Sequence, residues 1–240
     1  MIGSLLPPFL PASIGGAIEF IFEPQSSSVT GGKKVGGFEQ VVELTITQLE
    51  LTLLALAVAL VVALPVGLYL GHRGTGELLA IAIGNAGRAI PELALIALMA
   101  VVFGVGFQYV TIALAVLGIP PILTNAFVGI RQVDRAPIDA ARGMGMTEAE
   151  ILFRVEMPLA IPTLMAGIRG ATIAIVATAT IAPLAGVLTL GDFIINRNVY
   201  GASGLLAGGI LVALLALVLE FSLAALQRAL TSKGLKVSAA

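Results

Sequence analysis

The 240-residue chain contains no cysteine, no tryptophan, only one histidine and few charged residues. The lack of cysteine excludes disulfides, thiolate metal sites and a cysteine nucleophile, and one histidine cannot form a histidine metal cluster within the chain. Charged residues make up 11% of the chain, against about 25% in a typical soluble domain. The formal net charge of −1 gives no general attraction to nucleic acid.

The chain is rich in hydrophobic residues. Hydrophobic residues make up 58% of it, and the mean hydropathy is +1.05. A soluble domain of this length could not bury so much apolar surface, so the surrounding solvent is predicted to be lipid. The composition therefore predicts an all-α protein that crosses a membrane several times.

Long charge-free runs give the positions of the membrane spans, because a spanning helix needs about 20 apolar residues. The run from Leu93 to Ile130 is too long for one span, and the glycines within residues 104–109 predict a tight turn inside it. We predict a membrane domain over residues 38–230 with five spans: 49–70, 86–105, 110–130, 161–189 and 204–227.

The N-terminal part, residues 1–37, is harder to assign. Residues 5–22 are apolar, but they contain three prolines and lack the basic start of a secretory signal peptide. We expect a helix lying in the membrane interface there, with a sixth span as the alternative. Residues 25–37 are rich in serine and glycine, which predicts a flexible linker.

The distribution of lysine and arginine predicts the orientation. With five spans, eight basic residues fall on one side of the membrane and three on the other. The richer side holds the connection at residues 131–160 and the C-terminal tail at 231–240, so both are predicted to be cytoplasmic in a cell (inner or plasma) membrane. The basic residues of that side are Arg73, Arg131, Arg135, Arg142, Arg154, Arg228, Lys233 and Lys236, against Lys33, Lys34 and Arg197 on the other.

The connection between the third and fourth spans concentrates charge. Residues 134–158 hold five of the 14 acidic residues and three of the 13 lysines and arginines. Asp134 is placed to cap a short helix. A charged segment in so apolar a protein predicts a contact surface for another chain, although an ordinary interfacial loop is the simpler alternative.

The same segment predicts two short helices along the membrane surface. Gly143 and Gly145 should break the first helix. Residues 147–150 read Thr-Glu-Ala-Glu, which fits a capping box at the start of the second. Pro158 and Pro162 should end the second helix and turn the chain into the fourth span.

The spacing in this segment resembles the EAA loop of the membrane subunits of ATP-binding cassette (ABC) importers. That family's pattern is Glu-Ala-Ala, three residues, Gly, nine residues and Ile-x-Leu-Pro. Here Asp139-Ala140-Ala141, Gly145 and residues 155–158 keep the spacing, with Asp for Glu, Val for Ile and Met for Leu. The residues that this resemblance assigns to ATPase docking are Asp139, Ala140, Ala141, Arg142, Gly143, Met144, Gly145, Met146, Val155, Met157 and Pro158. Asp139 could equally pair with Arg142 three residues on.

The wider sequence, from about residue 38 to residue 228, resembles the osmoprotectant branch of that family, whose solutes are glycine betaine, carnitine, choline and proline. The supporting segments are Ala63–Gly67, Arg88–Ala94, Gly118–Leu123 and Asp139–Ile173. Where many relatives carry Gly-Ala-Gly-Gly-Leu-Gly after the fourth span, residues 184–192 differ, so the outer gate region is expected to differ too.

The resemblance implies a permease subunit rather than an enzyme. The expected partners are two ATPase subunits that bind ATP and Mg, a second permease subunit (identical or different) and an extracytoplasmic substrate-binding protein. This chain is expected to bind no cofactor. Gly31-Gly32-Lys33-Lys34 hints at a phosphate loop, but Ser27 stands where that motif needs its upstream glycine.

Within the spans, Pro91, Asn125 and Pro183 are candidates for the solute path or its gate, although Asn125 could instead bind neighbouring backbone. Arg169 and Glu220 are expected either to reach the interface or to pair across helices. The chain has no tryptophan and three dispersed tyrosines, which predicts no aromatic cage for quaternary ammonium solutes. Selectivity then falls mostly to the delivering protein.

An ABC importer for an amino acid or another small solute fits the same loop. An ion-coupled secondary transporter should show inverted repeats and polar ion ligands at mid-bilayer, and neither is clear here. An intramembrane enzyme would need a nucleophile–base pair that this composition hardly supplies, and export subunits usually carry different loops.

Overall fold

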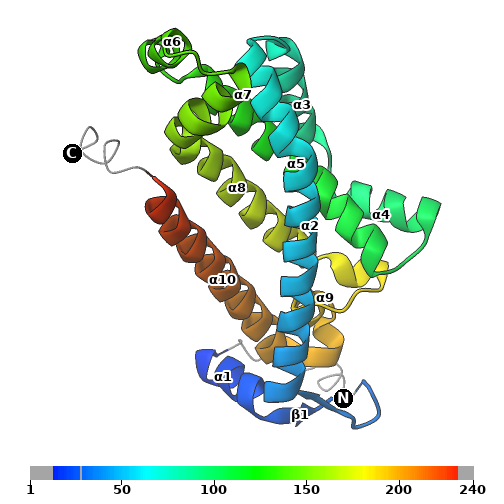
Figure 1. Cartoon of the computed structure of the whole chain (residues 1–240). Coiled ribbons are helices and arrows are strands. Elements are labelled where there is room, and N and C mark those ends of the chain that lie inside the picture. The colour runs from blue at the N-terminus through cyan, green and yellow to red at the C-terminus, as the bar shows by residue number, and fades with distance from the viewer. Residues whose placement is uncertain (1–12, 28, 232–240) are drawn as a thin grey trace.

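The computed structural model describes residues 13–27 and 29–231, and it is almost entirely helical. Its elements run from a short N-terminal helix and hairpin into a set of long helices (Figure 1). They are α1 (Ile14–Phe22), β1 (Pro24–Ser26), β2 (Lys34–Gly36), α2 (Gly37–Arg73), α3 (Glu77–Ala89), α4 (Glu92–Phe103), α5 (Phe107–Arg131), α6 (Arg135–Gly143), α7 (Glu148–Ile151), the π-helical turn η1 (Leu152–Glu156), α8 (Met157–Ala179), the 3₁₀ turn η2 (Ala182–Ala185), α9 (Gly191–Ile195) and α10 (Arg197–Leu230).

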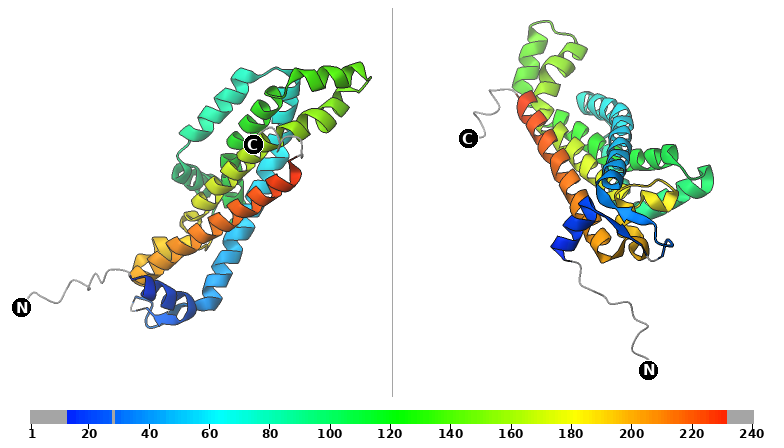
Figure 2. Two further views of the ribbon diagram at one scale, coloured as in Figure 1. Left: turned by 90° about the vertical axis from the view of Figure 1, so that its left-hand side faces the viewer. Right: turned by 90° about the horizontal axis from the view of Figure 1, so that it is seen from below.

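The long helices run between two distinct ends of the molecule. Figure 1 shows α6, α7 and the C-terminal end of α2 at one end, which we call the loop end, and α1, the hairpin and α9 at the other, which we call the hairpin end. The views in Figure 2 show α6 and α7 projecting away from the bundle, with the C-terminal end of α10 toward the same end. The chain therefore presents the charged connection at one end only.

Helices α2, α5 and α8 form the core of the bundle. Their buried faces share one apolar cluster that includes Leu51, Leu114, Ile122 and Ile175. Small residues let the backbones approach closely, since a Cβ on Gly67 would lie 2.5 Å from the Cβ of Ala126. Small interfacial residues are typical of helix packing in membranes.

A buried glutamine ties this core to the hairpin end. Gln48 is fully buried on α2. Its Nε2 donates to the carbonyl of Val176 on α8 at 3.2 Å, and its Oε1 accepts from the backbone N–H of Leu190 at 3.1 Å. The amide thus satisfies backbone groups of two other segments, which a buried polar side chain must do to be tolerated.

Within the described residues, four helical runs are long and apolar enough to cross a membrane, and a bent pair makes a fifth if it is counted as one span. The predicted spans 49–70, 110–130 and 204–227 lie within α2, α5 and α10. The predicted span 86–105 is not one helix: the run Glu77–Gly87 and α4 meet at 87°. Pro91 explains the break, because the residue before a proline is driven into extended backbone, and Ile90 has φ −74° and ψ 119°.

The predicted span 161–189 ends early. Helix α8 stops at Ala179, because Pro183 has no N–H to donate to the carbonyl four residues before it. The hydroxyl of Thr189 donates to that Ala179 carbonyl instead, at 2.9 Å. The chain then forms the 3₁₀ turn η2, so residues 182–189 cap the helix rather than extend it.

The expected turn at Pro158 and Pro162 is also absent. The chain runs as one 32-residue helix from Glu148 to Ala179, and the π-helical turn η1 ends two residues before Pro158. In that turn the N–H of Met157 bonds to Leu152, five residues back. The wider turn accommodates the proline without a break. Residues 148–156 of this helix belong to the charged connection, and the apolar part of the helix follows them.

The N-terminal region differs from the expected linker. Strands β1 and β2 pair antiparallel, with Gln25 opposite Val35, so the described ends of the serine- and glycine-rich segment are structured. The described part of the expected interfacial helix is α1, nine residues long, which is too short to span a bilayer. The remaining residues of that prediction, 5–12, lie outside the described residues.

Candidate functional site

The first helix of the charged connection begins and ends as its sequence predicts. The carboxylate of Asp134 caps α6 by accepting from the N–H of Ala136 at 3.2 Å. Helix α6 ends at Gly143, and Gly145 takes φ +84°, a conformation that glycine adopts at little cost. The N–H of Met146 then returns to the carbonyl of Ala141 at 3.2 Å. The glycine break is therefore a closed, hydrogen-bonded turn.

The second helix carries the predicted capping box. The N–H of Glu150 donates to Thr147 Oγ1 at 3.3 Å, and the N–H of Thr147 donates to Glu150 Oε2 at 3.0 Å. These reciprocal bonds satisfy donors that a helix start otherwise leaves free. They fix where α7 begins, only a few residues after α6 has ended.

An ion-pair network joins the two helices. The guanidinium of Arg142 binds both carboxylate oxygens of Glu148, each at 3.1 Å, and lies 3.7 Å from Asp139. The hydrogen bonds of this pair raise the pKa of the Arg142 guanidinium and lower the pKa of the Glu148 carboxyl. The predicted Asp139–Arg142 pair is present, but Glu148 is the closer partner, and sequence reasoning missed it.

The connection is also tied to the end of α2. His72 Nδ1 lies 2.6 Å from Glu156 Oε2, and His72 Nε2 lies 3.3 Å from Glu148 Oε2. Glu156 is buried although it follows the exposed end of the loop. One indication of this contact is present in the sequence: His72, the only histidine, lies two residues beyond the predicted span 49–70.

The residues assigned to docking fall into two groups. From Asp139 to Gly145 the residues are exposed except Ala141, which is buried, and Met144 is 77% exposed, whereas Met146 is half-buried. Val155, Met157 and Pro158 are half-buried on the helix that continues into α8. The first group therefore lies on the surface of the molecule, and the second joins that surface to the bundle.

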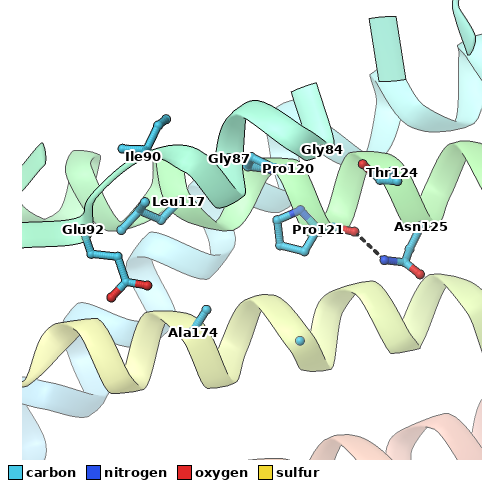
Figure 3. A pocket seen from close by; sticks show the side chains of 11 residues that line it. Gly84, Gly87, Ile90, Glu92, Leu117, Pro120, Pro121, Thr124, Asn125 and Ala174 are labelled. Carbon is cyan, nitrogen blue, oxygen red and sulfur yellow. Dashed lines mark hydrogen bonds between the residues drawn. The ribbon is translucent and has the colours of Figure 1, made fainter. Parts of the chain in front are cut away.

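A pocket of about 300 Å³ lies beside the break between α3 and α4 (Figure 3). Glu92 points toward α8 in this view, and its carboxylate accepts from Thr178 Oγ1 at 2.6 Å. Asn125 lines the pocket and donates to the Pro121 carbonyl at 2.8 Å, so it does bind neighbouring backbone. The lining residues are Gly84, Gly87, Ile90, Glu92, Leu117, Pro120, Pro121, Thr124, Asn125, Gly170 and Ala174.

The other two path candidates do not line this pocket. Pro91 stands at the break that forms one of its walls, and Pro183 lies in the turn η2. Across the described ranges, no group of three His, Cys, Asp or Glu side chains is placed to hold a metal ion. The intramembrane pocket therefore offers one carboxylate, hydroxyl and amide groups and small apolar surfaces.

A bundle of spanning helices with a pocket at a broken span and a rigid charged connection at one end defines a multi-pass membrane transport component. Residues 63–232 match the family described as "Binding-protein-dependent transport system inner membrane component". The chain belongs to this family, which supplies the membrane subunits of ABC importers.

Individual relatives agree with this assignment. The chain is 38% identical over 189 residues to the carnitine transport permease protein OpuCB of Listeria monocytogenes, covering 78% of this chain and 87% of that protein. It is 36% identical over 193 residues to the choline transport system permease protein OpuBB of Bacillus subtilis, covering 80% and 89%. Among solved structures, an inward-facing MetNI methionine ABC transporter chain aligns with a TM-score of 0.71 and 25% identity, over 81% of this chain and 98% of that one.

Proposed function

We propose that this chain is the permease subunit of an ATP-driven importer for a small osmoprotectant such as glycine betaine, choline, carnitine or proline. The observation that carries the solute class is the 36–38% identity to carnitine and choline permeases over most of both chains. The likeness to a methionine transporter chain is weaker, at 25% identity. An amino-acid importer is therefore the second candidate.

The charged connection is proposed to dock a partner ATPase in the cytoplasm. The positions of the basic residues support this orientation, because Arg73, Arg131 and Arg142 lie at the loop end, whereas Lys34 and Arg197 lie in β2 and at the start of α10. Cytoplasmic segments are enriched in lysine and arginine. Each ATPase would bind ATP and Mg, and the complete transporter would hold two ATPases and two permease subunits.

Movement of the docked ATPase would reach the bundle through stiff contacts. Helix α7 continues without a break into α8, and α6 is held to α7 by the Arg142–Glu148 pair. A displacement of this connection would tilt α8 rather than bend a loop. Rigid-body motion of this kind is a common way to alternate access to a central path.

The pocket at the α3–α4 break is proposed to form part of the solute path. Carnitine, choline and glycine betaine each carry a quaternary ammonium group, and the Glu92 carboxylate supplies the opposite charge. At about 300 Å³, the pocket is at the small end of the range for ligand sites. No aromatic ring is among its lining residues, so binding should be weak and brief, as a transit site requires. An extracytoplasmic binding protein would deliver the solute.

The test is co-expression with a partner ATPase and binding protein of an osmoprotectant importer, in cells that lack osmoprotectant uptake. ATPase capture and uptake of labelled glycine betaine, choline and methionine are measured. Asp139→Lys on the exposed face of α6 should reduce capture and uptake together. Glu39→Lys, an exposed charge reversal at the hairpin end, is the matched control and should reduce neither capture nor the folded yield.

Two outcomes would contradict the proposal. Undiminished capture by the Asp139→Lys variant would remove the docking role of α6. Accumulation of methionine without any of the quaternary ammonium solutes would replace the proposed solute class with the second candidate.

A further inference from the structure

Thr178, in the last turn of α8, uses its hydroxyl differently from the other buried threonines of α2, α5 and α8. Thr52, Thr111 and Thr172 each donate to the carbonyl four residues earlier in their own helix, a partner that a helical threonine reaches readily. Thr178 is 2% exposed, and its Oγ1 donates instead to Oε2 of Glu92 at 2.6 Å. The hydroxyl therefore joins α8 to the first residue of α4.

This hydrogen bond fixes the position of the Glu92 carboxylate. Glu92 is an exposed residue directly after the break at Pro91, so its side-chain torsions would otherwise be free to turn the carboxylate away. Among the described side chains, Thr178 is the only one bonded to it. Figure 3 shows the carboxylate turned toward α8, on the side of the pocket where Ala174 lies. The bond occupies Oε2 and leaves Oε1 for a ligand, because both oxygens of an ionised carboxylate accept hydrogen bonds.

The surrounding contacts separate this positioning from the packing of the helices. Helix α4 is anchored in the apolar core by Ile96, which is 2% exposed, so loss of the bond should free the carboxylate without releasing the helix. The polar side chains of the pocket are engaged elsewhere: Asn125 donates to the Pro121 carbonyl, and Thr124 donates to the carbonyl of Ala80.

Thr178 itself does not line the pocket. It lies behind the carboxylate, where it can act on a solute only through Glu92.

We propose that Thr178 is a positioning residue that holds the Glu92 carboxylate at the pocket, and that its hydroxyl thereby gives the pocket its preference for quaternary ammonium cations. A hydrogen bond to an ionised group is stronger than one between neutral groups. Holding the carboxylate close matters because the attraction between two charges falls with their separation. The inference deepens the proposed function and rests on it, since solute selection by Thr178 requires the α3–α4 pocket to lie on the solute path.

The absence of cysteine allows a direct test on the purified full-length chain in lipid nanodiscs. Ala174→Cys places one thiol at the pocket. Two methanethiosulfonate reagents are compared, one with a choline-like trimethylammonium-ethyl group and one with an anionic sulfonatoethyl group. The thiolate attacks the sulfur of either reagent, forms a mixed disulfide and releases methanesulfinate.

The ratio of the two modification rates, divided by the same ratio for a small thiol in solution, reports the charge beside the pocket. We expect this ratio to favour the cationic reagent in the Ala174→Cys parent. Adding Glu92→Gln should abolish that preference.

Substitutions at two threonines then separate positioning from packing. Thr178→Val keeps the shape of the side chain and removes the hydroxyl, so the ratio should fall about tenfold, toward that of Glu92→Gln. Thr178→Ser restores a hydroxyl and should keep the preference. Thr172→Val is the matched control, because Thr172 is 1% exposed on the same helix and its hydroxyl bonds within that helix; it should keep the preference too. With Glu92→Gln already present, Thr178→Val should lower the ratio no further.

Three results would overturn the proposal: no preference for the cationic reagent in the parent, a Thr178→Val ratio equal to that of the parent, or an equal fall in Thr172→Val. Misfolding of Thr178→Val would show as the loss of its thermal unfolding transition. Thr178→Ala, which is smaller and also lacks the hydroxyl, then decides the question.

No transport takes part in these rates, so they are independent of the uptake experiment. In uptake, Thr178→Val should raise the KM for choline more than the KM for proline and leave the maximal rates little changed. A reagent preference that depends on Thr178, in a chain that takes up no choline, would support the positioning and remove the proposed solute class. Choline uptake together with a ratio that ignores Thr178 would keep the solute class and overturn the positioning.

Discussion

The guanidinium of Arg169 on α8 donates to the carboxylate of Glu220 on α10, with 2.9 Å between Nε and Oε1. The same guanidinium donates to the side chain of Gln227 at 2.9 Å. None of the most apolar 18-residue stretch of α10 is buried in the bundle, so this polar contact is a link between the C-terminal half of α10 and α8. Of the two expectations for Arg169 and Glu220, reaching the membrane interface or pairing across helices, the structure shows the pair.

Replacing one partner of this pair should destabilise the protein. Glu220→Gln would leave the Arg169 charge without a counter-charge in an apolar setting. We expect a measurable loss of stability that is smaller than the loss for a fully buried pair, because both side chains are partly exposed. Thermal unfolding in detergent measures it. The reversed pair, Arg169→Glu with Glu220→Arg, should recover most of the loss; if it is no more stable than Glu220→Gln, the charges do not hold α10.

The glycine break in the connection can be tested with a matched pair of substitutions. An added Cβ would meet nothing within 4 Å at either Gly143 or Gly145, but only Gly145 has a positive φ. Gly145→Ala should therefore destabilise the turn by about 1–2 kcal/mol through backbone strain, and Gly143→Ala should not. Amide exchange of residues 135–151 measures local opening. Equal exchange in the two variants would show that backbone strain at Gly145 is not what maintains the turn.

Local features of this fold could be predicted from the sequence because they depend on neighbouring residues. The Asp134 cap, the capping box at Thr147 and the glycine break each involve residues within a few positions of one another. The apolar runs that mark α2 and α5 are local in the same sense. Element boundaries were less accurate where a proline changed the path, as at Pro91 and Pro183.

Contacts between distant segments could not be predicted in this way. His72 meets Glu156 across 84 residues, and Gln48 meets Leu190 across 142. Each pairing is decided by how the helices pack, which residue spacing does not encode. The pairing of β1 with β2 was missed for a similar reason, since Phe20 of α1 covers Gly36 and the serine-rich composition alone gives no sign of that contact.

Close packing between α5 and α8 should depend on Gly167. A Cβ there would lie 2.5 Å from the Cβ of Asn125 and 2.8 Å from the Pro121 carbonyl, so Gly167→Ala should force the helices apart and lower stability by about 1–3 kcal/mol. Gly209 on α10 has open space around it. Gly209→Ala should be neutral or stabilising by up to about 1 kcal/mol. Melting temperatures that fall equally in both variants would contradict this packing.

The carboxylate in the pocket should matter most for cationic solutes. Glu92→Gln keeps an acceptor for Thr178 but removes the charge. Choline uptake should fall about tenfold, which corresponds to ~1.4 kcal/mol, while proline uptake should change less because proline carries its own carboxylate. Glu77→Gln, an exposed replacement at the start of α3, is the control. Unchanged choline uptake by the Glu92→Gln variant would remove Glu92 from the path.

The hairpin end is held by an aromatic cluster that should respond selectively to substitution. Phe20 of α1 is fully buried, with its ring centroid 5.2 Å from that of Phe193 and 6.2 Å from that of Tyr200. The hydroxyl of Tyr200 donates to the buried Asp192 at 2.5 Å. These contacts connect α1 to α9 and α10, so they should determine whether residues 13–36 stay folded against the bundle.

Phe20→Ala should release this end, because removal of a buried phenylalanine ring typically costs about 3–5 kcal/mol. Phe22→Ala, on the same helix, removes a ring that is 63% exposed and should leave the packing intact. Tyr200→Phe should fall between them at about 1–2 kcal/mol, since it deprives Asp192 of one hydrogen bond. Limited proteolysis between residues 23 and 37 is the measurement. Cleavage that is equally fast in the Phe20→Ala and Phe22→Ala variants would mean that lipid, rather than the aromatic cluster, holds α1 in place.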